Sequence, residues 1–362
     1  MKPPIREILR SAVYQMKFMD RVPDSAVCNE AVKLAQKKGF YNLKPFVNGV
    51  LRAIARNKDQ LELPSREKDL VRYLSVRYSM PEPLILRWME IYGEETTEKI
   101  LRDFLEEKPL TVRCRTYLNS VEDICESLRS QGVKVEDAPY LPYAKKISGF
   151  NHILALDAFI EGKITVQDVS SMLVAEIAAP SKGDYVIDLC AAPGGKAIHM
   201  AEKLAGSGHV EARDLTEYKV GLINENIQRS RLDNIEAVCH DATVYDEAAK
   251  DKADIVIADL PCSGLGVLGK KVDLKYKMTE DMQRDLAGLQ RKILSVVHTY
   301  VKPGGKLVYS TCTIHRGENE DNARWFEETY PQFRLVKEQQ FLPGREEGDG
   351  FYIALFERER HG

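Results

Sequence analysis

The sequence predicts an α/β fold in which a doubly wound, mainly parallel sheet follows a small α+β module and an all-helical N-terminal segment. Three observations support this prediction. Apolar residues recur at helical spacing at the start of the chain, a short strand–helix–strand pattern follows, and strand-like and helical segments alternate beyond residue 161. Strands that alternate with helices are typical of a parallel sheet with helices on both faces.

The first sixty residues predict three amphipathic helices. Apolar residues recur every three or four positions around Ile8, Val32 and Leu51, and Gly39 follows the second of these segments. The polar stretch over 56–69 then indicates a linker. We therefore predict a helical segment over residues 1–60.

Residues 66–160 combine a helical linker with a small α+β module. The helical pattern runs to about residue 107 and is broken at Pro81 and Pro83. The extended "PLTVRCRTYL", the helical "SVEDICESLRSQG" and the extended "KVEDAP" and "AKKISG" follow in that order. This order predicts a compact module with its own sheet.

Residues 161–362 predict the doubly wound domain. Its expected strands cover 185–189, 209–213, 235–238, 253–258 and 305–310, with helices between most of them. The segments "FRLV" and "GFYIALFE" near the end have the spacing of a hairpin.

The composition predicts a multi-domain cytoplasmic protein. The chain has 362 residues, 44% of them hydrophobic and 30% charged, and lacks the run of about 20 apolar residues that spans a bilayer. Its seven cysteines are scattered without a CxxC pair, so neither a disulfide framework nor a metal site is expected. The net charge of −3 gives no overall signal for nucleic acid, which leaves local basic patches open.

The loop after the first strand of the doubly wound sheet predicts a cofactor site, because that loop usually approaches the ligand most closely. It consists of Cys190, Ala191, Ala192, Pro193, Gly194, Gly195 and Lys196. Small residues and two glycines let the backbone lie against a ligand. The spacing is neither GxGxxG nor GxxxxGK[ST], so a dinucleotide or a phosphate cradle is not favoured.

Asp214, Asp241 and Asp259 follow the second, third and fourth strands. An acid after the second strand is placed to bind both ribose hydroxyls, and one after the third suits an adenine amine. S-adenosylmethionine also carries a sulfonium and an ammonium group, which three acids attract. Each aspartate alone is as often a turn residue, but the series predicts S-adenosylmethionine as the cofactor.

Two cysteines also follow strands. Cys262 stands in "DLPCSG" after the fourth strand and Cys312 in "STCT" after the fifth. A free cysteine is usually a small apolar core residue. The neighbouring glycine-rich loop and acids indicate instead that both thiols face one pocket. Geometry alone leaves open which of them performs chemistry.

The motifs "DLCAAPGGK", "DLPCSG" and "YSTCTIHRGENE", in this order, resemble those of the RsmB/Sun and Nop2 family of S-adenosylmethionine-dependent RNA cytosine-C5 methyltransferases. The resemblance implies a Rossmann-like, seven-stranded methyltransferase domain over 161–362, an RNA-binding module with its helical linker over 66–160, and a partial NusB-like segment over 1–60. The sequence departs from the family pattern in three ways. The NusB-like part begins part-way, Arg115 replaces an asparagine, and Leu260 replaces the commoner alanine.

The resemblance also implies roles for the site residues. A thiolate that adds to C6 of cytosine makes C5 nucleophilic, and the family assigns this attack to Cys312 and product release to Cys262. In DNA cytosine methyltransferases the attacking cysteine instead corresponds to Cys262. We place a protonated Asp259 at N3 of the base. Lys196 either orients the base or cofactor or is a plain helix-start lysine.

We expect RNA as the partner, with the target cytosine unpaired or flipped out. RNA contacts are expected from Arg113, Lys270, Lys271 and Lys275, although each is also explained as a solvated charge. The expected target is a cytosine of small-subunit (16S) ribosomal RNA, and the protein is expected to be a monomer without membrane association. The alternatives are a transfer-RNA target, a methyltransferase acting on nitrogen or a small molecule, and a non-catalytic ribosome-assembly protein.

Overall fold

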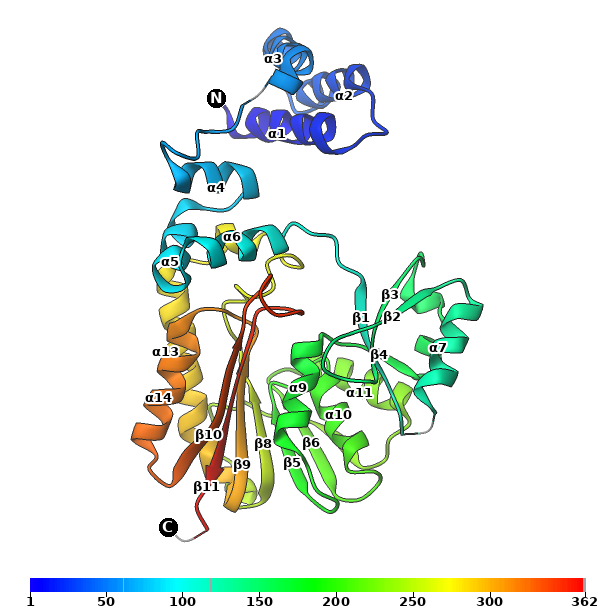
Figure 1. Ribbon diagram of the computed structural model, residues 1–362, viewed down its shortest axis with the longest axis vertical. Coiled ribbons are helices and arrows are strands. Elements are labelled where there is room, and N and C mark those ends of the chain that lie inside the picture. The colour runs from blue at the N-terminus through cyan, green and yellow to red at the C-terminus, as the bar shows by residue number, and fades with distance from the viewer. Residues whose placement is uncertain (61, 118, 361–362) are drawn as a thin grey trace. The chain divides into compact units, whose positions relative to one another are not determined.

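The computed structural model describes residues 1–60, 62–117 and 119–360, so the last two residues of the predicted catalytic domain lie outside the described part (Figure 1). The chain forms two compact units, Met1–Arg77 and Tyr78–Gly362. None of the described helices combines the length and the apolar character needed to cross a bilayer.

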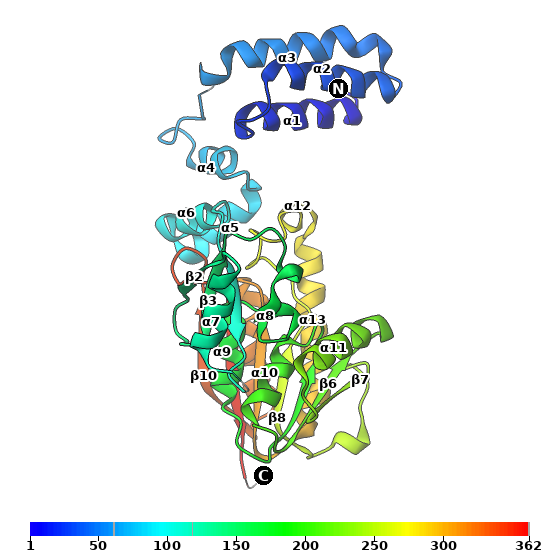
Figure 2. The same cartoon turned by 90° about the vertical axis from the view of Figure 1, so that its right-hand side faces the viewer.

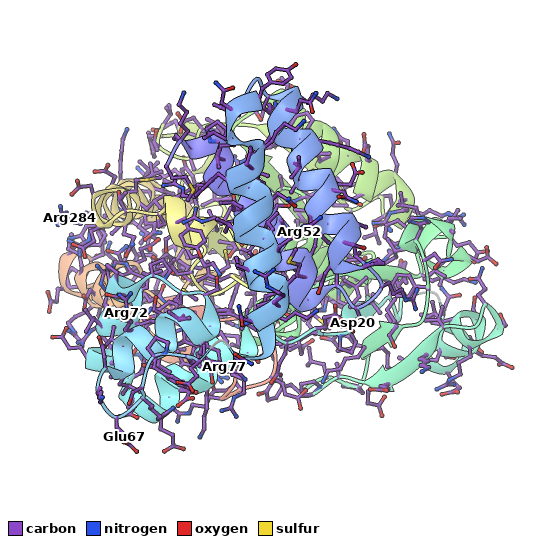
Figure 3. All side chains as sticks on the ribbon, turned by 90° about the horizontal axis from the view of Figure 1, so that it is seen from above. Asp20, Arg52, Glu67, Arg72, Arg77 and Arg284 are labelled. Carbon is purple, nitrogen blue, oxygen red and sulfur yellow. The ribbon has the colours of Figure 1, made fainter. Side chains whose placement is uncertain are left out.

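The first unit contains the three predicted helices and one more. Its helices are α1 (Pro3–Phe18), α2 (Asp24–Lys37), α3 (Lys44–Asn57) and α4 (Leu70–Tyr78). The apolar stripes of α1, α2 and α3 meet in a core of their own that includes Ile5, Ala35 and Leu51, all fully buried. Arg52 belongs to α3 and Arg77 to α4 (Figure 3).

The second unit begins with two helices and a small antiparallel sheet. Its elements are α5 (Glu82–Tyr92), α6 (Glu94–Asp103), β1 (Leu110–Cys114), α7 (Val121–Ser130), β2 (Lys134–Asp137), β3 (Ala144–Ser148), α8 (Asp157–Ile160) and β4 (Ile164–Val166). The strand order is β2-β3-β1-β4. β4 lies beyond residue 160 but pairs antiparallel with β1, so it belongs to the small sheet.

A seven-stranded sheet follows, which confirms the predicted fold class. Its strands are β5 (Tyr185–Leu189), β6 (His209–Asp214), β7 (Ile235–Cys239), β8 (Ala253–Asp259), β9 (Val301–Thr311), β10 (Phe333–Phe341) and β11 (Phe351–Arg358). Their order is β10-β11-β9-β8-β5-β6-β7. The strands β5 to β9 are parallel, and β10 and β11 form the predicted hairpin, antiparallel to each other and to β9.

Helices cover both faces of this sheet (Figures 1 and 2). They are α9 (Val169–Ala178), α10 (Gly195–Lys203) and α11 (Glu217–Ser230) on one face, α13 (Glu280–Val297) and α14 (Glu320–Thr329) on the other, and the one-turn α12 (Leu274–Lys277). Ile255 and Ile257 of β8 pack into the apolar core beneath α9, α10 and α11. Val256 packs into the core on the opposite face, beneath α13 and α14. Apolar side chains on both faces are what a sheet covered on both sides requires.

A buried ion cluster joins the small sheet to the large domain. Glu202 of α10 pairs with Arg113 of β1 and with Arg115. Arg113 also donates from Nε to Gln167 at 2.8 Å, and only 1% of its surface is exposed. A guanidinium enclosed in this way cannot reach an RNA phosphate from its position. The predicted RNA contact at Arg113 therefore does not fit the structure, and the residue serves the domain junction instead.

We predict that Glu202→Ala lowers stability strongly, because it leaves two buried guanidinium groups without their counter-charge. The expected loss is about 3–5 kcal/mol, or roughly 10 °C in the midpoint of thermal unfolding. Circular dichroism during heating measures it. The matched control is Glu95→Ala, which removes an exposed pair with Lys99 and is expected to cost less than about 1 kcal/mol. Equal midpoints for the two variants would contradict a stabilising role for this cluster.

Candidate functional site

The two strand-end cysteines meet at the carboxyl edge of the large sheet. β8 and β9 run parallel with Asp259 opposite Ser310, and the amide of Leu260 continues the pairing by donating to the Ser310 carbonyl at 3.1 Å. Cys262 and Cys312 lie a few residues beyond this point on their chains. Their Sγ atoms are 3.2 Å apart, and both residues are half-buried. The two thiols therefore share one site.

The backbone on both sides of Cys262 is held by buried side chains. Gln290 of α13 donates from Nε2 to the Pro261 carbonyl at 2.9 Å, and the Ser263 amide donates to Glu318 Oε2 at 2.8 Å. Gln290 Nε2 also lies 3.1 Å from the same Glu318 oxygen. Gln290 and Glu318 are both fully buried. The position of Cys262 is thus fixed from the α13–α14 side of the sheet.

The loop after Cys262 lies directly on the backbone of Cys312. The Gly266 amide donates to the Cys312 carbonyl at 3.2 Å, and the Gly350 amide donates to the Gly266 carbonyl at 2.8 Å. A Cβ atom added to Gly266 would come within 2.0 Å of the Gly350 carbonyl oxygen. This close approach requires glycine at position 266.

The surroundings make the two thiols unequal. A hydrogen bond from Cys262 lowers the pKa of Cys312. Lys271 and Lys196 act in the same direction, whereas burial and the Asp259 carboxylate raise this pKa. The same hydrogen bond, burial and the Glu318 carboxylate raise the pKa of Cys262 well above its ordinary value. Cys312 is therefore the thiol that more readily becomes a thiolate, and Cys262 is the one that keeps its proton.

A lysine–aspartate pair lies beside the thiols. Lys196 Nζ lies 2.7 Å from Asp259 Oδ2, and the Ser310 hydroxyl donates to Asp259 Oδ1 at 2.8 Å. Burial lowers the pKa of Lys196, but Asp259 and Asp188 raise it by more, so the ammonium form is retained. Asp259 thus accepts one hydrogen bond at each carboxyl oxygen. The proton expected on Asp259 stays a prediction.

The loop between β5 and α10 is the one for which a cofactor cradle is predicted. Cys190 and Gly194 have left-handed backbone conformations, with φ of 56° and 104°. The Ala191 amide donates to the Arg213 carbonyl at 2.9 Å and the Gly194 amide to the Ala191 carbonyl at 2.7 Å, which ties the loop to β6. A side chain at Gly194 would be strained and would touch Ile223 at 3.4 Å. Pro193 and Gly195 complete a surface with little side-chain bulk, which fits the close approach of S-adenosylmethionine.

The acids after β6 and β7 differ in exposure. Asp214 accepts hydrogen bonds from the amides of Ala192 at 2.9 Å and Leu215 at 2.7 Å, and only 2% of its surface is exposed. It orders the cradle in this arrangement, and its contact with a ribose stays a prediction. Asp241 is exposed, and its Oδ1 accepts from the Thr243 amide and hydroxyl, both at 2.8 Å. Its role toward an adenine amine likewise stays a prediction.

Two buried acids of the site were missed by the sequence reasoning. Glu318 stands inside the "HRGENE" motif, and Asp188 interrupts the apolar run of β5 between Ile187 and Leu189. Neither carboxylate oxygen of Asp188 has a side-chain hydrogen-bond partner among the described residues, and burial raises its pKa well above the ordinary value. The sequence did contain a signal for Asp188, because a lone acid within a strand that is apolar on both faces must be buried.

The lysines predicted to contact RNA lie after Gly266. Lys270 is exposed but pairs with Asp349 at 2.6 Å and with Asp168 at 3.4 Å, so it also fastens the loop to two other segments. Lys271 and Lys275 have no ion-pair partner within the described ranges. Lys275 lies in α12 rather than in an open loop. Their contacts with RNA stay predictions.

Three segments of the chain match known families. Residues 175–357 match the family described as 16S rRNA methyltransferase RsmB/F, residues 1–56 match the NusB family, and residues 80–153 match the ferredoxin-like domain of RsmF/B-like methyltransferases. The last match agrees with the small antiparallel sheet of the second unit.

Curated relatives cover most of the chain. A probable ribosomal RNA small subunit methyltransferase B from Bacillus subtilis is 37% identical over 92% of this chain and 74% of its own length. A protein of the same description from Synechocystis is 32% identical over 97% of this chain and 82% of its own length. The ribosomal RNA small subunit methyltransferase B of Serratia proteamaculans is 31% identical over 96% of this chain and 80% of its own length.

Solved structures agree with the fold. The crystal structure of PH0851 superposes with a TM-score of 0.86 at 29% identity over 99% of this chain and 83% of that one. The structure of NSun6 from Pyrococcus horikoshii with SFG gives a TM-score of 0.70 at 23% identity, over 78% of this chain and 99% of that one. At this identity the likeness shows the fold alone. The methyl donor of the matched family is S-adenosylmethionine. By its sequence matches the chain belongs to the RsmB/F family of 16S rRNA methyltransferases.

Proposed function

We propose that this protein methylates C5 of a cytosine in small-subunit ribosomal RNA through a covalent cysteine adduct. The observation that carries the proposal is the pair of unequal thiols, 3.2 Å apart, beside the cofactor cradle. Methyl transfer to nitrogen or to a small molecule requires no such pair. The names of the relatives support ribosomal RNA as the substrate.

Cysteine chemistry meets a specific need of this reaction, because C5 of cytosine is too weak a nucleophile to accept a methyl group unaided. The Cys312 thiolate adds to C6, an Sγ–C6 bond forms, and the electron pair of the C5–C6 double bond becomes available at C5. S-adenosylmethionine, when bound, supplies the methyl group as an electrophile. The hydrogen bond from Cys262 and the charges of Lys271 and Lys196 lower the pKa of Cys312, which favours the reactive thiolate.

The Lys196–Asp259 pair is placed to serve the base edge. Addition at C6 builds negative charge at N3 of the ring. A hydrogen bond donated to N3 by the Lys196 ammonium group stabilises this charge. Lys196 is the donor in this scheme, because Asp259 accepts from both Lys196 and Ser310. The pair thereby replaces the protonated aspartate expected from the sequence.

Product release needs a second group. After methyl transfer a water molecule takes the C5 proton, the C5–H electron pair re-forms the C5–C6 double bond, the Sγ–C6 bond breaks, and its electron pair returns to Cys312. In this scheme Cys262 assists the elimination by donating its proton toward the departing sulfur, since its Sγ lies 3.2 Å from that of Cys312. Its raised pKa keeps it from competing as the nucleophile.

The charge distribution supports an RNA partner. Residues 1–60 hold twelve Lys and Arg against five Asp and Glu, although the whole chain has a net charge of −3. A basic segment of this kind binds phosphates without regard to sequence. The net charge of the whole chain does not reveal this local basic region.

We predict opposite outcomes for the two cysteine variants. With unmethylated small-subunit ribosomal RNA and cofactor, Cys262→Ala accumulates a protein–RNA adduct that survives denaturation, because release is impaired. Cys312→Ala forms no adduct and no 5-methylcytosine, because the nucleophile is absent. Denaturing gel electrophoresis and nucleoside mass spectrometry measure the two products.

Cys28→Ala is the matched control for these variants, since it removes a buried thiol of α2 and leaves the site intact. An adduct in Cys312→Ala would exchange the two roles. Full activity in both site variants would refute the cysteine mechanism and favour a different methyl acceptor.

We predict that Glu318→Ala behaves as a weak form of Cys262→Ala. Loss of the carboxylate frees the Ser263 amide and Gln290, so Cys262 loses its fixed position. Each unsatisfied buried group also costs about 1–3 kcal/mol of stability. The adduct assay at a temperature where the variant remains folded measures the effect. Glu328→Ala, an exposed change on α14, serves as control, and adduct levels equal to those of this control would argue against the role.

The target is tested in cells. We expect that deletion of the gene removes 5-methylcytosine from one position of small-subunit ribosomal RNA, and that the wild-type gene restores it but a Cys312→Ala gene does not. Bisulfite sequencing of ribosomal and transfer RNA measures this. Loss of a transfer-RNA mark alone would reassign the substrate, and no loss in either would favour a non-catalytic role.

A further inference from the structure

We propose that Tyr276 of α12 stacks on an unpaired base of the RNA strand next to the target cytosine, with Lys271 and Lys275 at the flanking phosphates. The inference rests on the proposed function and extends it from the target base to its neighbours.

The segment that carries these residues is seated on the catalytic loop. The Leu274 side chain lies against Gly264, two residues beyond Cys262, where its Cδ1 would be 2.8 Å from an added Cβ. The Leu274 amide donates to the Lys271 carbonyl at 3.1 Å, which starts the turn of α12. Lys271 is close enough to lower the pKa of Cys312. A strand that delivers its cytosine to Cys312 therefore passes near this segment.

Tyr276 presents its ring to solvent in a fixed position. The residue is 67% exposed, and Val272 at the start of the segment is 57% exposed. The Tyr276 hydroxyl donates to the Ser79 carbonyl at 3.2 Å and lies 3.3 Å from the Ser79 hydroxyl. An aromatic ring anchored at its hydroxyl loses little conformational freedom when a base stacks on it.

The charges of the segment select a nucleic-acid strand as the occupant. Residues 270–277 contain four lysines and one acid, Asp273, which pairs with Lys277. Lys275 Nζ lies 5.3 Å from the centre of the Tyr276 ring. Aromatic rings beside lysines are the usual elements of single-strand binding, in which the rings stack on bases and the cations meet phosphates.

The test compares Tyr276→Ala with Tyr276→Phe in the full-length protein. The probe is a single-stranded oligoribonucleotide with one cytosine, and the readout is its dissociation constant by fluorescence anisotropy. Tyr276→Ala is expected to weaken binding about tenfold, since stacking contributes roughly 1–3 kcal/mol per base. Tyr276→Phe is expected to bind within about twofold of the wild type, because the ring remains.

Lysine variants test the phosphate contacts. Lys275→Gln is expected to lower the slope of log affinity against log salt by about 1. Lys250→Gln removes one exposed charge at the opposite end of β8 and is expected to leave that slope unchanged.

Unchanged RNA binding in Tyr276→Ala would overturn the inference. Tyr276→Phe would also overturn it if this variant weakened binding as much as Tyr276→Ala, because the loss would then come from the hydrogen bond to Ser79. Competition by poly-glutamate as strong as that by RNA would also overturn it, because a protein partner would then fit the surface. Failure of the proposed function appears separately. In that case the wild type makes no 5-methylcytosine, whatever the Tyr276 variants bind.

Discussion

The parallel pairing of β8 with β9 is the constraint on which the site depends. Asp259 lies opposite Ser310, and the chain continues from these two positions for three and two residues to reach the two cysteines. A shift of one residue in this register would turn the side chains of one strand to the other face of the sheet. The thiols would then separate, and the Ser310 hydroxyl would leave the Asp259 carboxylate. The register is well determined because both faces of β8 and β9 are packed in apolar cores.

Buried polar side chains extend this constraint from the strands to the loops. The Cys262 loop has no regular structure of its own, yet Gln290, Glu318 and the Cys312 carbonyl hold its backbone at three points. Burying a carboxylate is costly unless donors satisfy it. Here the donors come from the Ser263 amide and from α13, so the burial of Glu318 and the position of the loop depend on each other. This explains why residues far apart in the sequence control the place of one thiol.

The sequence was sufficient for those features that follow from local periodicity. The alternating strands and helices predicted the sheet, and the strand ends predicted where Cys262 and Cys312 would meet, because parallel strands bring their carboxyl ends to one edge. It was insufficient where a residue's role depends on a distant partner. Arg113 looked like a surface charge because Glu202, which encloses it, lies 89 positions away. The Lys196–Asp259 pair went unpredicted for the same reason, since the two residues lie 63 positions apart.

The same distant contacts decide how the two thiols divide their work. Hydrogen bonding between two sulfurs is symmetric in itself, so an external charge must select which one is ionised. Lys271 and Lys196 lower the pKa of Cys312 against the effect of Asp259, and Glu318 raises the pKa of Cys262. Glu318 therefore has two effects, because it fixes the Cys262 backbone and its negative charge also opposes a thiolate at Cys262. A neutral hydrogen-bond acceptor would provide the first effect and not the second. The Glu318 carboxylate is thus part of what disfavours a thiolate at Cys262 in the proposed reaction.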